Sequence, residues 1–242
     1  MPYIEEKCYA GDTIEIRKYY SSRYKVKGIK RSENKKPTVE EQKVVNSKRA
    51  EKELRRIINT NFKEGDYHLV LTYRKEDRTE DKEEIKKQMA KFVRGMREEY
   101  KKQGLEFKYV HVAEVGERGA LHHHLVVNAI DPKVINKLWK YGRVKINLLD
   151  ETGQYKKLAS YLIKYTDKVI GTEREIYGKR WNSSKNLEKP RIKKRIVSSK
   201  RGYNAEAREI KGYYIDKETV KSGISVFSGF PYYEYTLVKI KV

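Results

Sequence analysis

The strongest constraint on the fold is a regular alternation of strand-like and helix-like segments between residues 67 and 168. Runs rich in β-branched and aromatic residues predict strands, and apolar residues at helical spacing predict helices. The predicted strands are 67–73, 107–115, 121–128 and 143–148, and the predicted helices are 80–103, 131–141 and 154–168. This βαββαβα order predicts an α+β, ferredoxin-like (RRM-like) antiparallel sheet with its helices on one face.

The segments on either side of this core read as extensions, which gives three expected regions: 1–62, 63–170 and 171–242. The first includes a charged helix from Thr38 to about Asn61, with Thr38 as its cap. That helix either clamps DNA or is a solvated charged helix, and the pattern does not decide. In the last region, residues 179–201 hold ten basic residues and one acidic one, which predicts a flexible basic arm or a DNA-contacting loop.

The charge of the chain points to a polyanionic partner. Lys and Arg number 56 against 34 Asp and Glu, a formal net charge of +22. Such an excess favours nucleic acid over other partners. No segment is apolar enough to span a membrane, so a membrane partner is not expected. The start of the chain lacks the apolar stretch of a signal peptide, and the single Cys8 excludes an internal disulfide or a cysteine zinc cage. We therefore expect a cytoplasmic protein.

Three consecutive histidines on one predicted strand form the first candidate site. Alternate residues of a strand share a face, so His122 and His124 point one way and His123 the other. Glu114, on the preceding strand across a short turn, completes a candidate set of two imidazoles and one carboxylate. This set suits Mn²⁺ or Mg²⁺ and leaves positions open for water and a phosphate oxygen. The alternative is a group of partly buried histidines without a metal. His111 has the opposite parity from Glu114 and is expected in the core or on the surface.

A tyrosine-containing helix forms the second candidate site. Tyr161 and Tyr165 lie one turn apart on one helix face, and Lys164 and Lys168 each follow a tyrosine by three residues. A tyrosine hydroxyl, with an unperturbed pKa of about 10, is a poor nucleophile at neutral pH. A metal polarises the phosphate, and a nearby lysine stabilises negative charge or favours the phenolate. The alternative is that both tyrosines are only core residues of an amphipathic helix.

From about residue 50 to residue 168 the chain resembles the HUH replication initiators of plasmids and phages. The first family motif, a strand similar to LTLTY, corresponds to Leu69–Tyr73. The second, His-hydrophobic-His, corresponds to His122–His124, although the middle position is histidine here. The stretch 48–73 also resembles replication-associated proteins of Gram-positive bacteria and their phages.

The third family motif is a tyrosine with a lysine three residues later, which matches Tyr161 and Lys164. The two-tyrosine form of this motif resembles the phage type and fits Tyr161, Tyr165 and Lys168. Some family members use a single tyrosine, and for these the first one is the nucleophile.

The resemblance implies a rolling-circle replication initiator that nicks and rejoins single-stranded DNA at an origin. A divalent ion is expected on the carboxylate and the two imidazoles. Tyr161 would attack the scissile phosphate, leaving a 5′-phosphotyrosyl link and a free 3′-hydroxyl that primes synthesis. Lys164 would assist electrostatically, and Tyr165 would carry a second transfer that closes the circle.

The expected partners are single-stranded or hairpin origin DNA, a host helicase and a host polymerase. The sequence has no phosphate-binding glycine-rich loop, so no motor of its own is expected. Two other functions remain open. One is an HUH relaxase or single-strand transposase with the same chemistry. The other is a non-catalytic module that binds single-stranded nucleic acid by aromatic stacking and charge.

Overall fold

The computed structural model describes residues 1–21, 24–25, 28, 38–116, 120–197, 206–225 and 228–241. The chain divides into two units. The central unit contains residues 44–151 and 155–188, and the terminal unit contains residues 1–43, 152–154 and 189–242. Within the described residues, no helix has both the length and the apolar character needed to cross a bilayer.

The central unit is built on a five-stranded antiparallel sheet with the order β6-β3-β5-β4-β7. Its strands are β3 (Tyr67–Thr72), β4 (Tyr109–Val115), β5 (Leu121–Val127), β6 (Val144–Leu148) and β7 (Asn182–Ser183). The first four are the strands predicted from the sequence, with ends shifted by one or two residues. The predicted α+β, ferredoxin-like fold class is confirmed. The register places Glu114 directly opposite His122 on the neighbouring strand. The predicted turn between these strands falls partly on residues 117–119, which lie outside the described residues.

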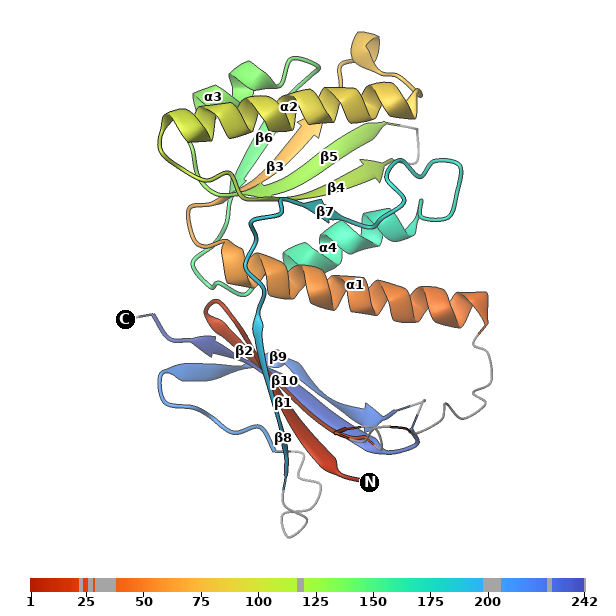
Figure 1. The fold of residues 1–242 in the computed structure, drawn as a ribbon, viewed down its shortest axis with the longest axis vertical. Coiled ribbons are helices and arrows are strands. Elements are labelled where there is room, and N and C mark those ends of the chain that lie inside the picture. Colours follow the sequence, from red (N-terminus) through yellow and green to blue (C-terminus); the bar gives the residue numbers. More distant parts are fainter. Residues whose placement is uncertain are drawn as a thin grey trace. The chain divides into compact units, whose positions relative to one another are not determined.

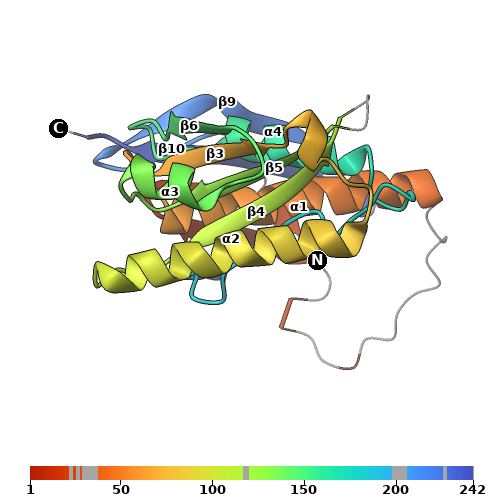
Figure 2. The ribbon, with the colours of Figure 1, turned by 90° about the horizontal axis from the view of Figure 1, so that it is seen from above.

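Helices cover both faces of this sheet (Figure 1). They are α1 (Val39–Asn61), α2 (Lys82–Lys102), α3 (Pro132–Leu138) and α4 (Lys156–Asp167), with a short 3₁₀ helix at Lys75–Asp77. Helices α2 and α3 lie side by side over one face, as Figure 2 also shows. Helices α1 and α4 pack against the other face.

The prediction that all helices share one face was therefore wrong for α4. The reason is that both faces of the strands are apolar. Leu69 and Leu71 of β3 point into the core beneath α2, whereas Val110 and Val112 of β4 point towards α1 and α4. A sheet with two apolar faces has to be covered on both.

Two helix ends illustrate how local chemistry sets the boundaries. The hydroxyl of Thr38 accepts a hydrogen bond from the backbone N–H of Glu41 (3.2 Å), whose carboxylate accepts one from the N–H of Thr38 (2.9 Å). This capping box starts α1 where it was predicted. Helix α3 ends at Leu138, earlier than predicted. Trp139 is already extended there, and its indole N–H donates to the carbonyl of Thr72 (3.0 Å).

The terminal unit joins the two ends of the chain in a second antiparallel sheet, with the order β8-β1-β2-β10-β9. Its strands are β1 (Tyr3–Ala10), β2 (Thr13–Tyr20), β8 (Arg191–Ile196), β9 (Tyr213–Ile224) and β10 (Pro231–Lys239). Strands β2 and β10 pair antiparallel with each other in this sheet. Their inward side chains form a separate small core around Ile16, Tyr235 and Leu237.

The predicted flexible arm at 179–201 is corrected by the structure. Its described part contains β7 and the edge strand β8, while residues 198–201 lie outside the described residues. Strand β8 pairs antiparallel with β1. Two of its basic side chains meet acids of β1, since Lys194 lies 2.9 Å from Glu6 and Arg195 lies 2.8 Å from Glu5. Backbone pairing and these ion pairs explain why a strongly basic segment is ordered.

Candidate active site

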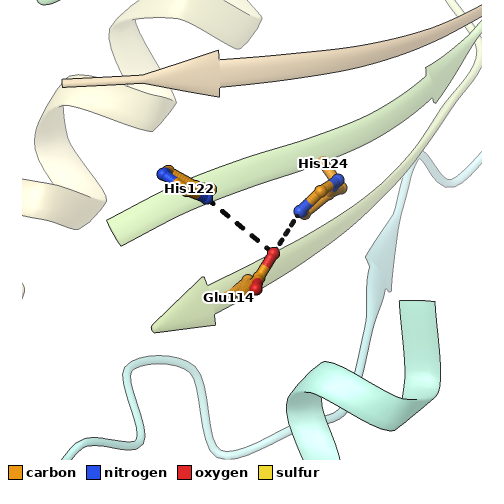
Figure 3. A group of neighbouring side chains, drawn as sticks. All are labelled: Glu114, His122 and His124. Carbon is orange, nitrogen blue, oxygen red and sulfur yellow. Dashed lines mark hydrogen bonds and ion pairs between the residues drawn. The ribbon is translucent and has the colours of Figure 1, made fainter. Parts of the chain in front are cut away.

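Two neighbouring strands of the central unit bring an acid and two imidazoles together (Figure 3). His124 Nε2 lies 2.7 Å from Glu114 Oε2, and His122 Nδ1 lies 3.9 Å from the same oxygen. One potential ligand atom from each of the three residues lies within 4.8 Å of the others. Strand alternation places both histidines on one face, and antiparallel pairing sets the carboxylate opposite them.

The donor set fits a divalent cation. Adjacent ligands of an octahedral ion at about 2.1 Å are separated by about 3 Å, and the two measured spacings bracket that value. The side chains of His124 and Glu114 are only 1% and 12% exposed, whereas that of His122 is 35% exposed. Burial raises the pKa of Glu114, and the nearby charges of His122 and Lys168 oppose that rise. The cluster could therefore hold a divalent metal ion, with the His122 side open to solvent.

A further histidine lies behind the cluster and was missed by the sequence analysis. His68 on β3 places Nε2 3.1 Å from Nδ1 of His124. Burial, and to a lesser extent the neighbouring His124, lowers the pKa of His68 to about 4. The contact fixes the ring of His124 so that its other nitrogen faces Glu114. His68 and His124 are 56 residues apart in the sequence, so no local pattern predicts their contact. It follows only from the register between β3 and β5.

Helix α4 brings both predicted tyrosines to the same face of the sheet. The ring of Tyr161 lies 5.7 Å from the ring of His124, and that of Tyr165 stacks on His124 at 6.1 Å. The two tyrosine rings are 4.7 Å apart. Tyr161 is 41% exposed, while Tyr165 is partly buried. A single helix turn thus presents two hydroxyl-bearing rings beside one imidazole of the candidate metal cluster.

The phenol of Tyr161 is not activated in the free protein. Burial, a hydrogen bond with Tyr165 and the charge of Glu114 together raise the pKa of Tyr161 to about 12. Each of these influences favours the neutral hydroxyl. Attack by this group therefore requires positive charge or a base that arrives with the substrate or the cation.

The two predicted lysines differ in their position. Lys168 acts electrostatically on Glu114, which places its charge near the cluster. Lys164 is exposed on α4, one turn from Tyr161, and within the described part of the chain it forms no ion pair. The structure therefore gathers Glu114, both imidazoles, both tyrosines and Lys168, and leaves Lys164 in solvent.

The third histidine of the run lies on the opposite face, as strand alternation predicts. His123 Nδ1 is 3.0 Å from His111 Nε2, and His123 Nε2 is 3.0 Å from the hydroxyl of Tyr73. All three side chains are buried. Burial holds the pKa of His123 well below its usual value and lowers that of His111 to about 3. His111 is thus a core residue, one of the two expected positions.

Comparison with known proteins supports a replication protein. Residues 66–170 match the family model of the replication-associated protein ORF2/G2P. The matched segment contains Glu114, the two candidate histidine ligands and both tyrosines. No curated protein and no solved structure shows significant similarity to the chain. The family match supports a role in replication initiation for a protein of the Rep type.

Proposed function

We propose that this protein is an HUH-type rolling-circle initiator that nicks and rejoins single-stranded DNA through a tyrosine. The observation that carries the proposal is the placement of Tyr161 and Tyr165 beside His124, on the same sheet face as Glu114 and His122. Tyrosines with only a packing role would be expected among apolar side chains. These two instead lie beside an imidazole of the candidate metal cluster. The family match over residues 66–170 favours replication over mobilisation or transposition.

In this proposal Glu114, His122 and His124 hold Mn²⁺ or Mg²⁺. When bound, the ion supplies Lewis-acid polarisation of a phosphate oxygen. His68 keeps the ring of His124 in place, and second-layer contacts of this kind are common at metal sites. The partly exposed edge of the cluster at His122 is where a DNA phosphate has access.

Tyr161 is the proposed nucleophile because it is the more exposed of the two tyrosines that lie beside His124. Its oxygen attacks the scissile phosphorus, and the bond to the 3′-oxygen breaks. The products are a 5′-phosphotyrosyl link and a 3′-hydroxyl. Lys168, whose charge acts on Glu114, stabilises the negative charge that develops. Tyr165, whose ring lies 4.7 Å from that of Tyr161, is the proposed carrier of the second transfer that rejoins the strand.

The proposed partners follow from this chemistry. The free 3′-hydroxyl serves as a primer for a host polymerase. A host helicase is the proposed source of strand separation. The net charge of +22 suits association with single-stranded or hairpin DNA at an origin.

The proposal is tested with a random library of labelled single-stranded DNA, incubated with the full chain and Mn²⁺ or with a chelator. The expected result is a covalent protein–DNA adduct that survives denaturation and forms only with the metal. Sequencing the captured DNA then identifies the preferred site. Tyr161→Phe should abolish the adduct and retain DNA binding, whereas Tyr214→Phe, at an exposed tyrosine of the terminal unit, should leave it intact.

An adduct that persists in Tyr161→Phe and disappears only with Tyr165→Phe would reassign the nucleophile. Tight, strongly salt-dependent DNA binding with no adduct and no metal requirement would replace the enzyme with a binding module.

A further inference from the structure

The terminal unit contains a pocket of its own, separate in sequence from the candidate active site. It has a volume of about 240 Å³ and lies on the face of the sheet that carries Ile16 and Tyr235. Side chains of β1, β2, β8 and β10 line it together with residues 208–210. Binding pockets for drug-sized ligands begin at about 300 Å³, so this one suits a phosphate together with part of the attached nucleoside.

Positive charge is concentrated in this pocket around one shared carboxylate. Glu5 lies 2.8 Å from Arg195 and 3.8 Å from Lys7, and in the β1–β2 register it stands directly opposite Lys18. A single carboxylate therefore faces three cations. Arg208 adds a fourth cation to the lining and Glu209 a second acid, so cations remain in excess.

Lys18 is the most buried cation of the lining. The residue is only 7% exposed, and Glu5, which lies directly opposite it on β1, acts on its charge. Burial lowers the pKa of Lys18; Glu5 opposes that effect, and the charges of Arg208, Lys7 and Arg195 reinforce it. Positive charges gathered in a small pocket repel one another. An anion entering the pocket would offset this repulsion.

Apolar groups beside these cations suit the rest of a nucleotide. Ile16, Ile210 and the ring of Tyr235 form an apolar surface against which a base or sugar can pack. The hydroxyl of Tyr235 accepts a hydrogen bond from the backbone N–H of Arg208 (3.1 Å), which holds the segment carrying Arg208 against the sheet. Cations and an aromatic surface thus meet in one small cavity.

We propose that this pocket binds the phosphate of a nucleotide, with Lys18 and Arg208 as its principal ligands and Tyr235 beside the base or sugar. The nucleotide is either a segment of single-stranded DNA or a free mononucleotide, which share this chemistry. In the DNA case the inference rests on the proposed function, because the pocket is then a second contact for the strand that is nicked.

The test is equilibrium binding by the full chain in a chelating buffer, so that nicking does not contribute. Thymidine monophosphate is titrated by calorimetry, and a short labelled oligothymidylate by fluorescence anisotropy. Lys18→Gln and Arg208→Gln are compared with Lys221→Gln, which removes an exposed charge of β9 outside the pocket. Because Arg208 is exposed, its variant should fold even if Lys18→Gln does not.

We expect each pocket variant to weaken mononucleotide binding about tenfold, since a lost hydrogen bond to a charged group has roughly that effect. Lys221→Gln should bind as the unaltered chain does. If the pocket variants lose affinity for the oligothymidylate to the same extent, the pocket binds DNA. If they lose affinity only for the mononucleotide, the pocket binds a free nucleotide.

Equal effects of Arg208→Gln and Lys221→Gln on both ligands would overturn the inference, as would the absence of saturable mononucleotide binding. The proposed function is tested separately, because the Tyr161→Phe variant should bind the mononucleotide normally. If the unaltered chain binds the mononucleotide but never forms an adduct, only the proposed function is refuted. If it forms adducts but does not bind the mononucleotide, only the inference is refuted.

Discussion

The two faces of β5 give the same residue type opposite environments. On one face, His122 and His124 lie beside a carboxylate and two tyrosines, with part of the cluster open to solvent. On the other face, His123 is fully buried, and each of its ring nitrogens has a partner in His111 or Tyr73.

The difference lies in the partners and in access to solvent. Both ring nitrogens of His123 have partners, His111 and Tyr73, within the buried core. Both ring nitrogens of His124 also have partners, but one of them is the carboxylate of Glu114. Donor atoms converge on that face, and the cluster has a partly exposed edge at His122. A carboxylate among the converging donors and an accessible edge, more than residue type, therefore distinguish the candidate metal face from the core face.

The largest effect is expected for His124→Ala. It removes a candidate metal ligand, and a catalytic metal contributes several kcal/mol to transition-state stabilisation, so adduct formation should fall roughly a thousandfold. Single-turnover adduct formation at saturating Mn²⁺, with calorimetric titration of Mn²⁺, measures both consequences. If this variant retains full Mn²⁺ affinity, His124 is not a metal ligand.

The next effect is expected for His123→Ala, which tests the other face. The variant leaves a cavity and removes the hydrogen-bond partner of the buried Tyr73 hydroxyl and of His111. The free energy of unfolding should therefore fall by about 2–4 kcal/mol. Urea denaturation measures this change. Mn²⁺ affinity of the folded fraction should be unchanged. Loss of Mn²⁺ binding without loss of stability would reverse the roles assigned to the two faces.

A smaller effect is expected for His68→Ala. The variant removes the contact that orients His124, and loss of such a contact lowers metal affinity by roughly 10- to 100-fold. His68→Gln, which retains a side-chain hydrogen-bonding group, should restore part of the affinity. If His68→Ala changes the free energy of unfolding but leaves the Mn²⁺ affinity unaltered, His68 has only a packing role.

The last effect concerns pH. The pKa of His111 is about 3 in the folded chain, against about 6.5 when unfolded. Above pH 6.5 both states are neutral and the contribution of His111 to stability is fully present. As the pH falls from 6.5 towards 3, only the unfolded state binds the proton, so stability is lost. His111→Gln should therefore reduce the pH dependence of the urea midpoint in this window. An unchanged dependence would contradict the assigned pKa.

Much of the central unit followed from local sequence. Periodicity identified β3 to β6 and helices α1, α2 and α4, because each has an apolar face that its neighbours bury. The separation of His122 and His124 from His123 required only the two-residue period of a strand. Glu114 was found because a hairpin brings nearby residues into register.

Other features depend on pairing between distant residues and leave no local signal. The terminal unit pairs β1 with β8, about 190 residues apart in the chain, so its two halves read as unrelated extensions. The basic residues of β8 looked like a free arm because Glu5 and Glu6 are far away in sequence. His68 was missed for the same reason, since its contact with His124 depends on the β3–β5 register.

The most direct test of the central claim is to locate the DNA-bound residue by mass spectrometry of proteolysed adducts formed with Mn²⁺. We predict a peptide from α4 that carries a nucleotide through a 5′-phosphate on Tyr161, and no such peptide when the metal is chelated. A modified residue outside α4, or no modified peptide from a chain that has bound both DNA and Mn²⁺, would contradict the assignment of this sheet face as the active site.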